Sequence, residues 1–164
     1  MRANFLLNSV VLLLALQADA DTLKGKVISV ADGDTITVLD DTRTEHKIRL
    51  AGIDAPEKGQ AFGQVSKQSM VKLVAGQTVA VDWSKSDKYG RKVGKVLLNG
   101  QDINLEQIHR GLAWHYKQYQ REQSPADQQT YTDAENSAKE QVIGLWHDPA
   151  PVAPWDFRKR SKSD

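Results

Sequence analysis

The sequence predicts an α+β protein, mainly β, in which five short strands form a barrel and three helices pack against it. Short stretches of alternating, β-branched residues recur at nearly even intervals between turns rich in Gly, Asp and Asn. Longer stretches carry apolar residues at spacings of three and four, which is typical of amphipathic helices. The pattern contains no internal repeat and no second domain, so we expect the barrel and its helices to occupy residues 21–148.

The length and composition suit one globular domain without disulfides. The chain has 164 residues, of which 40% are hydrophobic and 26% charged, and it contains no cysteine. A chain of this length can bury a sizeable core, which must stabilise the fold alone. The formal net charge is only +1, so an argument for nucleic-acid binding has to rest on local clusters of charge.

Residues 1–20 predict a cleaved signal peptide. Arg2 precedes the apolar run 10–16, and the Ala-Asp-Ala sequence at 18–20 fits the small-x-small cleavage rule. The run is shorter than the roughly 20 residues that a bilayer span needs, which favours a cleaved signal over an N-terminal anchor. We therefore expect a secreted or periplasmic protein that begins near Asp21 and has no membrane attachment after cleavage.

The first three strands are predicted at residues 24–30, 35–39 and 45–50, joined by short turns. The first turn contains Asp32-Gly33, and the second is the polar segment 40–43. Consecutive strands of such a meander pair antiparallel. The start of the second strand should therefore lie beside the end of the third.

A helix is predicted at residues 60–75, between the third and fourth strands, with Gly76 at its end. One face of this helix is expected to pack on the core through Phe62, Val65, Ser69 and Leu73. The fourth and fifth strands are predicted at 78–83 and 93–98. Asn99-Gly100 closes the fifth strand and is a strong hairpin signal.

Two more helices are predicted after the strands. The shorter spans 104–110 and ends at Gly111. The longer begins at Ser124-Pro125, with Ser as cap and Pro at the first helical position, and runs to about Val142 before Gly144. Its buried face is expected to contain Tyr131, Ala134, Ala138 and Val142.

Residues 149–164 are predicted to form an irregular, partly mobile tail, because they combine several prolines with the basic cluster 158–162. Such a tail could add a sequence-independent attraction for phosphate that weakens with salt. A disordered, solubilising end is the interpretation that we favour.

Five strands, with one helix inserted after the third and the other helices at the C-terminal end, is the element order of an OB-type barrel. A barrel of this type leaves one face and its loops open to an extended polymer.

Each polar motif in these loops has an ordinary structural explanation when it is taken alone. Asp32-Gly33 suits a hairpin turn, and Asp54-Ala55-Pro56-Glu57 suits the start of a helix. Residues 85–95 suit a solvated basic loop. In combination these explanations weaken, because the predicted strand order brings the motifs together.

Two aspartates are expected to converge on one small site. Asp34 begins the second strand and Asp54 follows the third. Two carboxylates, a backbone carbonyl and water would suit Ca²⁺, which prefers oxygen ligands in loose geometry. Zinc is disfavoured, since cysteine is absent and no ligand spacing is seen among His46, His109, His115 and His147. The EF-hand spacing is also absent.

Arginines in the same motifs suit a phosphodiester. Arg49 and Arg91 could donate to phosphate oxygens and stabilise the extra negative charge of a five-coordinate transition state. Glu57 lies three residues after Asp54 and could accept a proton from an attacking water.

The chain resembles the thermonuclease (staphylococcal nuclease) family from about residue 24 to residue 146. The resemblance is specific because several motifs occur in the family's order. These motifs are Val30-Ala31-Asp32-Gly33-Asp34-Thr35, the segment from Arg49 to Glu57, Asp87-Lys88-Tyr89-Gly90-Arg91, Arg110-Gly111-Leu112-Ala113 and Gly144-Leu145-Trp146.

The resemblance implies the OB-type, SNase-like barrel with three helices and a Ca²⁺-dependent endo- and exonuclease. Such an enzyme would cut DNA, preferably single-stranded, and RNA with little sequence specificity, and would leave 3′-phosphate ends. The implied metal ligands are Asp34, Asp54 and the carbonyl of Ala55. The implied catalytic residues are Arg49, Glu57 and Arg91. The implied substrate contacts are Lys88, Tyr89 and Tyr119. A monomer without a stable protein partner is expected.

The sequence departs from the family pattern in two places. Ala55 replaces a threonine, which should not matter if the ligand is the backbone carbonyl. In residues 114–119 the aromatic pattern is shifted: Lys117 stands where the family has a tyrosine, so base stacking is expected to differ. Trp114 and Tyr116 could compensate, although core packing is the favoured role for Trp114. The alternative function is a non-catalytic OB-type nucleic-acid binder, in which the acidic and arginine positions would be lost.

Overall fold

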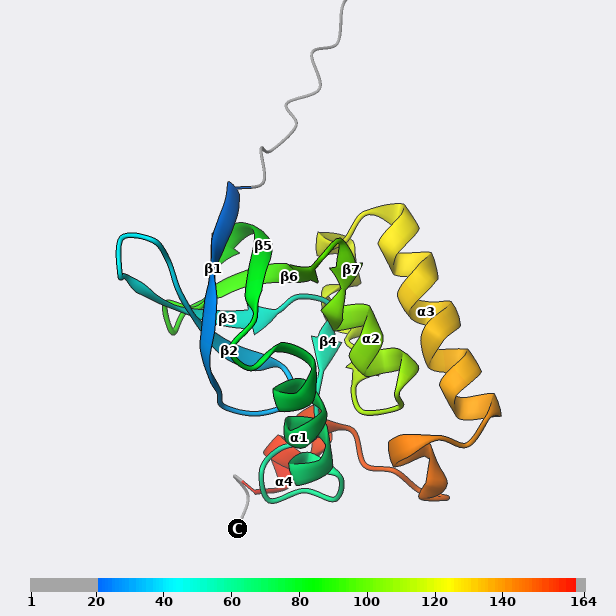
Figure 1. Ribbon diagram of the computed structural model, residues 1–164. Helices are drawn as coiled ribbons and strands as arrows, with labels where there is room; N and C mark the ends of the chain where they lie inside the picture. The colour runs from blue at the N-terminus through cyan, green and yellow to red at the C-terminus, as the bar shows by residue number, and fades with distance from the viewer. Residues whose placement is uncertain (1–20, 162–164) are drawn as a thin grey trace, which may run out of the picture.

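Five strands close into a barrel in the computed structural model, which describes residues 21–161 (Figure 1). They are β1 (Asp21–Val30), β2 (Thr35–Leu39), β3 (Glu45–Leu50), β5 (Thr78–Ser86) and β6 (Lys92–Leu98). β1 pairs antiparallel with β2 and β5, and the pairs β2–β3 and β5–β6 are also antiparallel. The parallel pair β3–β6 closes the barrel. The predicted five-stranded OB-type barrel is confirmed, whereas the predicted signal peptide lies outside the described residues.

Three two-residue strands extend this framework. β7 (Gln101–Asp102) pairs with the end of β6 across the Asn99-Gly100 turn. Both turn residues have positive φ, 51° and 82°, as the predicted hairpin turn requires. β4 (Ile53–Asp54) pairs with β8 (Trp114–His115) in a separate small sheet.

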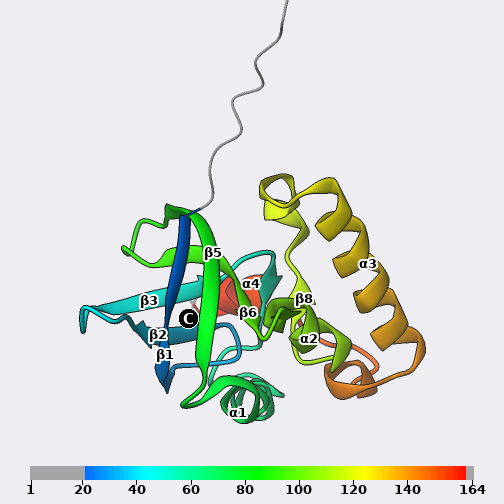
Figure 2. The ribbon, with the colours of Figure 1, turned by 45° about the horizontal axis from the view of Figure 1, so that its top comes forward.

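Helices lie outside the barrel (Figure 2). α1 (Gly63–Val74) follows β4, and α2 (Ile103–His109) and α3 (Pro125–Glu140) lie together on one side of the barrel. Ser124 caps α3 as predicted, since its Oγ accepts a hydrogen bond from the amide of Asp127 at 3.1 Å. Two 3₁₀ segments, Lys117–Glu122 and Gly144–His147, flank α3. Within residues 21–161, no helix is long and apolar enough to cross a membrane.

The core fills the barrel and continues beneath the helices. Alternate residues of the strands point inward, and residues of α1, α2 and α3 pack against the same core. Fully buried members include Val27, Ile36, Val38, Ile48, Leu50, Met70, Val74, Val81, Val96, Ile103, Ile108 and Tyr131.

The predicted buried faces of two helices need correction. The predicted Ser69 of α1 is buried and Leu73 is partly buried against the core, but Val65 is 50% exposed. The other buried residues of the helix are Gly63, Ser66, Met70 and Val74. The polar Ser66 can be buried because its hydroxyl donates to the carbonyl of Leu112 at 2.7 Å. α3 ends at Glu140, so Val142 lies beyond it and is exposed.

The C-terminal tail, expected to be irregular, contains a fourth helix, α4 (Pro154–Arg160). The described residues therefore hold four α-helices rather than three. Pro154 occupies a first-turn position, Asp156 lies in the first turn and three basic residues lie in the last. Each of these features stabilises a helix end, and they outweigh the breaking effect of the prolines before it.

Candidate active site

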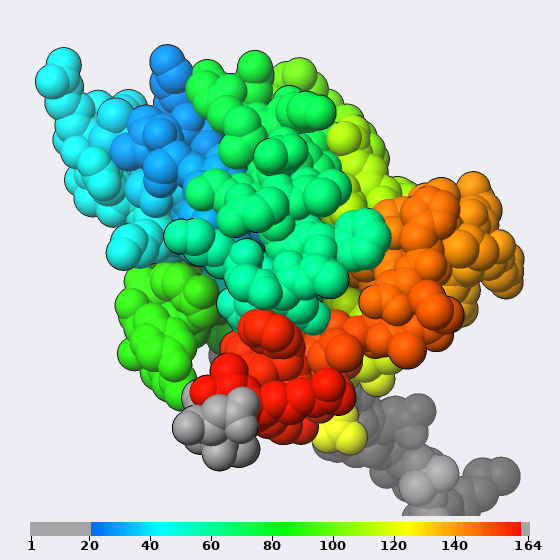
Figure 3. Space-filling view, turned by 90° about the horizontal axis from the view of Figure 1, so that it is seen from below, coloured from blue at the N-terminus to red at the C-terminus, as the bar shows by residue number. Residues whose placement is uncertain are grey.

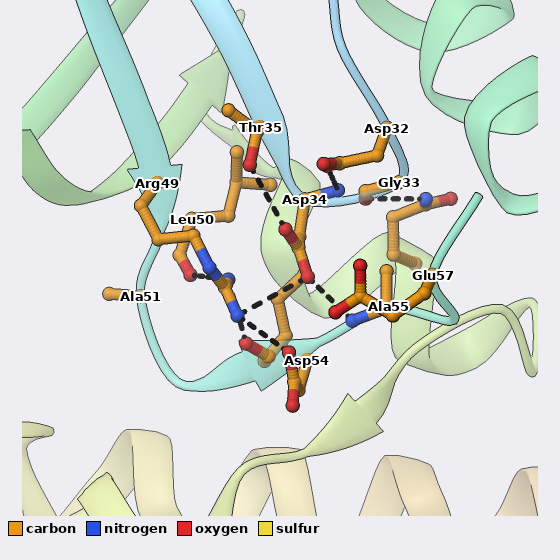
Figure 4. A network of polar contacts seen from close by, with 12 residues as sticks. Asp32, Gly33, Asp34, Thr35, Arg49, Leu50, Ala51, Asp54, Ala55 and Glu57 are labelled. Carbon is orange, nitrogen blue, oxygen red and sulfur yellow. Dashed lines mark hydrogen bonds and ion pairs between the residues drawn. The ribbon is translucent and has the colours of Figure 1, made fainter. Parts of the chain in front are cut away.

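The pairing of β2 with β3 brings Asp34 and Asp54 together (Figure 4). Thr35 is opposite Arg49, and the amide of Leu50 donates to the carbonyl of Asp34 at 2.9 Å. After β3 the chain turns at Gly52, whose φ is +72°, and enters β4 at Asp54. Nη2 of Arg49 lies 3.3 Å from Oδ2 of Asp34 and 2.8 Å from Oδ1 of Asp54. The expected convergence of the two carboxylates is confirmed.

Asp34 is buried and held from three sides. Its Oδ1 accepts from the hydroxyl of Thr35 at 3.2 Å, and its Oδ2 accepts from the amide of Ala55 at 2.5 Å. Burial raises the pKa of Asp34 to about 7 against the lowering effect of Arg49, and the nearby Asp32 and Asp54 carboxylates add to the rise. Burial thus disfavours the ionised form of Asp34, and a cation bound beside the carboxyl would favour that form again.

Gly33 lies in the turn between β1 and β2, just before Asp34, and sets the distance between this turn and α1. Its carbonyl accepts from Nε2 of Gln107 at 2.9 Å. A Cβ at position 33 would lie 1.8 Å from Oγ of Ser66 and 2.8 Å from Cβ of Ala55. The absent side chain therefore allows the Asp34 turn to pack directly against both α1 and the segment after β4.

The replacement Gly33→Ala is expected to destabilise the protein by about 1–3 kcal/mol, because the added methyl overpacks a buried contact. Urea unfolding followed by circular dichroism measures the change. Gly59→Ala is the matched control, since a Cβ there has nothing within 4 Å. Equal unfolding midpoints for the two variants would show that the close approach at Gly33 does not constrain the fold.

Arg158 from α4 is the unexpected member of the site. Its Nη1 donates to Oε1 of Glu57 at 2.7 Å and to Oδ1 of Asp54 at 3.2 Å, and its Nη2 donates to Oδ2 of Asp54 at 2.8 Å. Asp54 therefore receives two guanidinium groups, Arg49 on one side and Arg158 on the other.

Arg91 is held by an acidic residue on its own loop. Nε of Arg91 donates to Oδ2 of Asp87 at 2.7 Å, and the amides of Tyr89 and Arg91 donate to Oδ1. Burial alone would raise the pKa of Asp87, but these hydrogen bonds lower it and keep the carboxyl ionised. Asp87 thus fixes the loop that carries Arg91.

A groove of about 800 Å³ joins the predicted residues into one surface. All nine of them line it: Asp34, Arg49, Asp54, Ala55, Glu57, Lys88, Tyr89, Arg91 and Tyr119. The rings of Tyr89 and Tyr119 are exposed, and Lys85 Nζ lies 5.9 Å from the centre of the Tyr119 ring. The groove thus combines acidic, basic and aromatic side chains along an extended surface.

The aromatic residues of the segment 114–119, here called the aromatic wall, differ in their contacts from the expected pattern. Trp114 packs against Trp146, with ring centroids 4.4 Å apart, as expected for a core residue. Lys117 does not stack but pairs with the buried Glu135 at 3.0 Å. Tyr116 lines the groove, and Trp155 of α4 stacks on it with centroids 5.1 Å apart and planes 2° from parallel.

The donor set suits a hard cation better than zinc. Within residues 21–161, no group of three or more His, Cys, Asp or Glu is arranged to hold a metal ion. The site instead offers two buried carboxylates from Asp34 and Asp54 beside the buried Ala55. Oxygen donors of this kind, completed by water, fit Ca²⁺.

Three residues of the site were not predicted from the sequence: Arg158, Trp155 and Asp87. Asp87 stood within a recognised motif but had no assigned role. A helix could have been predicted at residues 154–160. The segment begins with a proline and an acidic residue and ends with basic residues, which is a known helix signal. No local pattern shows which carboxylates this helix would meet.

Comparison with known proteins gives a consistent result. The model of the family described as staphylococcal nuclease homologue matches residues 47–148. A micrococcal nuclease of Shigella flexneri is 40% identical over 164 aligned residues, which cover 94% of this chain and 91% of the relative. An uncharacterized endonuclease of Escherichia coli O157:H7 is 42% identical over 139 residues, 84% of this chain and 86% of the relative. An uncharacterized endonuclease of Haemophilus influenzae is 40% identical over 137 residues, which cover 84% of this chain and 74% of the relative.

Proposed function

The chain belongs to the staphylococcal nuclease family, and we propose from this premise that it is a Ca²⁺-dependent nuclease of DNA and RNA. That it is a phosphodiester hydrolase follows from the family. The observation that carries the finer proposal is the convergence of Asp34, Asp54 and Arg49 in the groove that also holds Glu57 and Arg91. This arrangement supports a hard cation and a phosphate at the same place.

The side chains divide the reaction between them. Asp34 and Asp54, with the Ala55 carbonyl, would hold Ca²⁺, which when bound polarises the phosphate. Arg49 and Arg91 donate to the phosphate oxygens and stabilise the charge that develops on them. Glu57 orients a water and accepts its proton as the oxygen attacks phosphorus. The P–O5′ bond breaks and O5′ takes up a proton from solvent, so the products are a 3′-phosphate and a 5′-hydroxyl.

The groove supports a preference for unpaired strands with little sequence specificity. Tyr89 and Tyr119 are exposed aromatic residues on which bases can stack, and Lys88 supplies a cation for a phosphate. Stacking and phosphate contacts tolerate any base, and a base must be unpaired to stack on a tyrosine. We extend the proposal to both DNA and RNA on the same grounds.

Export and a monomeric state complete the proposal. The pattern of residues 1–20 supports a signal peptide that directs the protein to the periplasm or the exterior. An exported nuclease acts where free Ca²⁺ reaches concentrations that weak oxygen sites can use. The monomeric state is proposed from the resemblance to the family.

Removal of calcium is expected to abolish digestion of heat-denatured DNA, because the two aspartates would then lack the cation that polarises the phosphate. Purified protein is incubated with the DNA in Ca²⁺, in chelator, and in chelator followed by excess Ca²⁺, and fragments are resolved on a gel. End analysis of a labelled oligonucleotide identifies the 3′-phosphate. Digestion that persists in chelator would refute the calcium dependence. Binding without cleavage in every condition would support the non-catalytic alternative.

A further inference from the structure

The C-terminal arm, residues 149–161, contributes Trp155, Arg158 and Lys159 to the lining of the groove and places Arg158 on the carboxylates of Asp54 and Glu57. Figure 3 shows this segment in red at one end of the molecule. Arg158 makes two hydrogen bonds to Asp54 and one to Glu57. Near its start the arm is held by Gln60, whose Nε2 donates to the carbonyl of Val152 at 2.5 Å.

The charges in the site show what Arg158 does there. The carboxyl groups of Asp34, Asp54 and Glu57 face the guanidinium groups of Arg49 and Arg158. The hydrogen bonds that Arg158 donates to the Asp54 carboxylate, and to a smaller extent the one to Glu57, raise the pKa of Arg158 above its ordinary value. Departure of Arg158 would leave three carboxyl groups opposite one arginine, a deficit of positive charge that suits a divalent cation.

Arg158, and not Arg49, is the group that can leave. The side chain of Arg49 is 14% exposed and also donates to the carbonyls of Leu50 and Ile53, each at 2.9 Å. The side chain of Arg158 is 38% exposed and comes from a helix of seven residues. A short terminal helix can undock without opening the barrel, whereas Arg49 is part of a barrel strand.

The same helix also covers an aromatic surface of the groove. Trp155 stacks on Tyr116 and meets Trp114 edge-on, with centroids 5.7 Å apart. In this position Trp155 occupies a face of Tyr116 that a nucleobase could use. One helix thus blocks both the carboxylates and part of the aromatic wall.

We propose that Arg158 is an internal cation that competes with Ca²⁺ for Asp54, so that metal binding releases Arg158 from both carboxylates and α4 from the groove. This inference rests on the proposed calcium-dependent function. It makes Arg158 the residue that sets the metal affinity and the concentration of Ca²⁺ at which the groove opens.

Calcium titration by calorimetry, without nucleic acid, tests the competition. Arg158→Ala is expected to bind Ca²⁺ about tenfold more tightly than the unaltered protein, because the charge-assisted hydrogen bonds no longer have to be broken. Arg160→Ala is the matched control: it removes the same charge from the same helix, and Arg160 lines a separate cavity and not this groove. At 0.15 M salt, where screening acts within about 8 Å, its Kd should change less than about twofold.

Hydrogen exchange of the unaltered protein gives a second readout. Ca²⁺ should speed exchange at the amides of Phe157 and Ser161, which donate within α4. A helix of this length is unstable once it leaves the protein surface. Amides of α3 serve as the internal control and should not change.

The outcomes separate this inference from the proposed function. Equal Kd values for the unaltered protein and Arg158→Ala, or unchanged exchange in α4, would overturn the competition and leave calcium-dependent cleavage standing. Failure of every variant to bind Ca²⁺ would overturn both. A tenfold tighter Kd in Arg158→Ala alone, together with faster exchange in α4, supports the proposal.

Discussion

Replacement of Glu57 by glutamine is expected to lower the turnover of single-stranded DNA by about 10²–10⁴-fold, the contribution typical of a positioned general base. Glutamine keeps the size of the side chain and still accepts a hydrogen bond from Arg158, but it cannot take a proton from water. The rate at saturating Ca²⁺ and substrate is the quantity to measure. Circular dichroism and urea unfolding should show a fold within about 0.5 kcal/mol of the unaltered protein, since the Glu57 side chain is 37% exposed.

Glu122→Gln is the matched control for this prediction. Glu122 lines the same groove, is 40% exposed and is paired with a basic residue, Lys85. It lies outside the cluster formed by Asp34, Asp54 and Arg49, so its loss should leave the rate within a few fold. A rate for Glu57→Gln that matches the rate for Glu122→Gln would mean that another group activates the water.

The barrel could be predicted from the sequence because its signals are local. Thr35–Leu39 and Glu45–Leu50 alternate over a short span and are bounded by turn residues, and the structure has both strands at the predicted residues. The buried face of α1 could not be read in the same way. Ser66 can be buried there because it donates a hydrogen bond to the carbonyl of Leu112, 46 residues away. The spacing of apolar residues gives no sign of such a contact.

The closeness of the two aspartates could be predicted because antiparallel pairing follows from the order of the strands. Once β2 and β3 are neighbours, Asp34 at the start of one must lie near Asp54 just beyond the other. The position of Arg158 does not follow from any such rule. It lies 104 residues from Asp54, and only the packed path of the arm brings the two together.

The role of Lys117 also could not be predicted from the sequence, because it depends on a contact in the folded protein. The resemblance to the family predicted an aromatic residue at position 117, where this chain has a lysine; in the structure this lysine pairs with Glu135. Glu135 is buried and also bonds to Lys139 and the amide of His115. Lys117 therefore stabilises the segment beneath the aromatic wall, and the ring facing the groove comes from Tyr116 instead.

Replacement of Arg91 by alanine is expected to lower kcat about 10²–10³-fold, the loss typical of a fixed donor to transition-state charge. KM for a short oligonucleotide should change far less, because Lys88 and the exposed tyrosines still bind the ground state. Arg110→Ala is the matched control. Arg110 is also paired through Nε with a carboxylate four residues earlier, Glu106, but it lies outside the groove-lining set. A rate for Arg91→Ala similar to that of Arg110→Ala would place the arginine outside the reaction.

Asp87 should act only through Arg91, which a double-mutant cycle can establish. Asp87→Ala removes the acceptor of the 2.7 Å hydrogen bond from Nε of Arg91 and the acceptor of two loop amides. Alone it should lower kcat by about tenfold, since a less well-oriented arginine loses part of its transition-state contact. Combined with Arg91→Ala it should lower kcat no further, because the group that Asp87 positions is already absent. Independent, multiplying losses would instead assign Asp87 a direct part in binding the substrate or the metal.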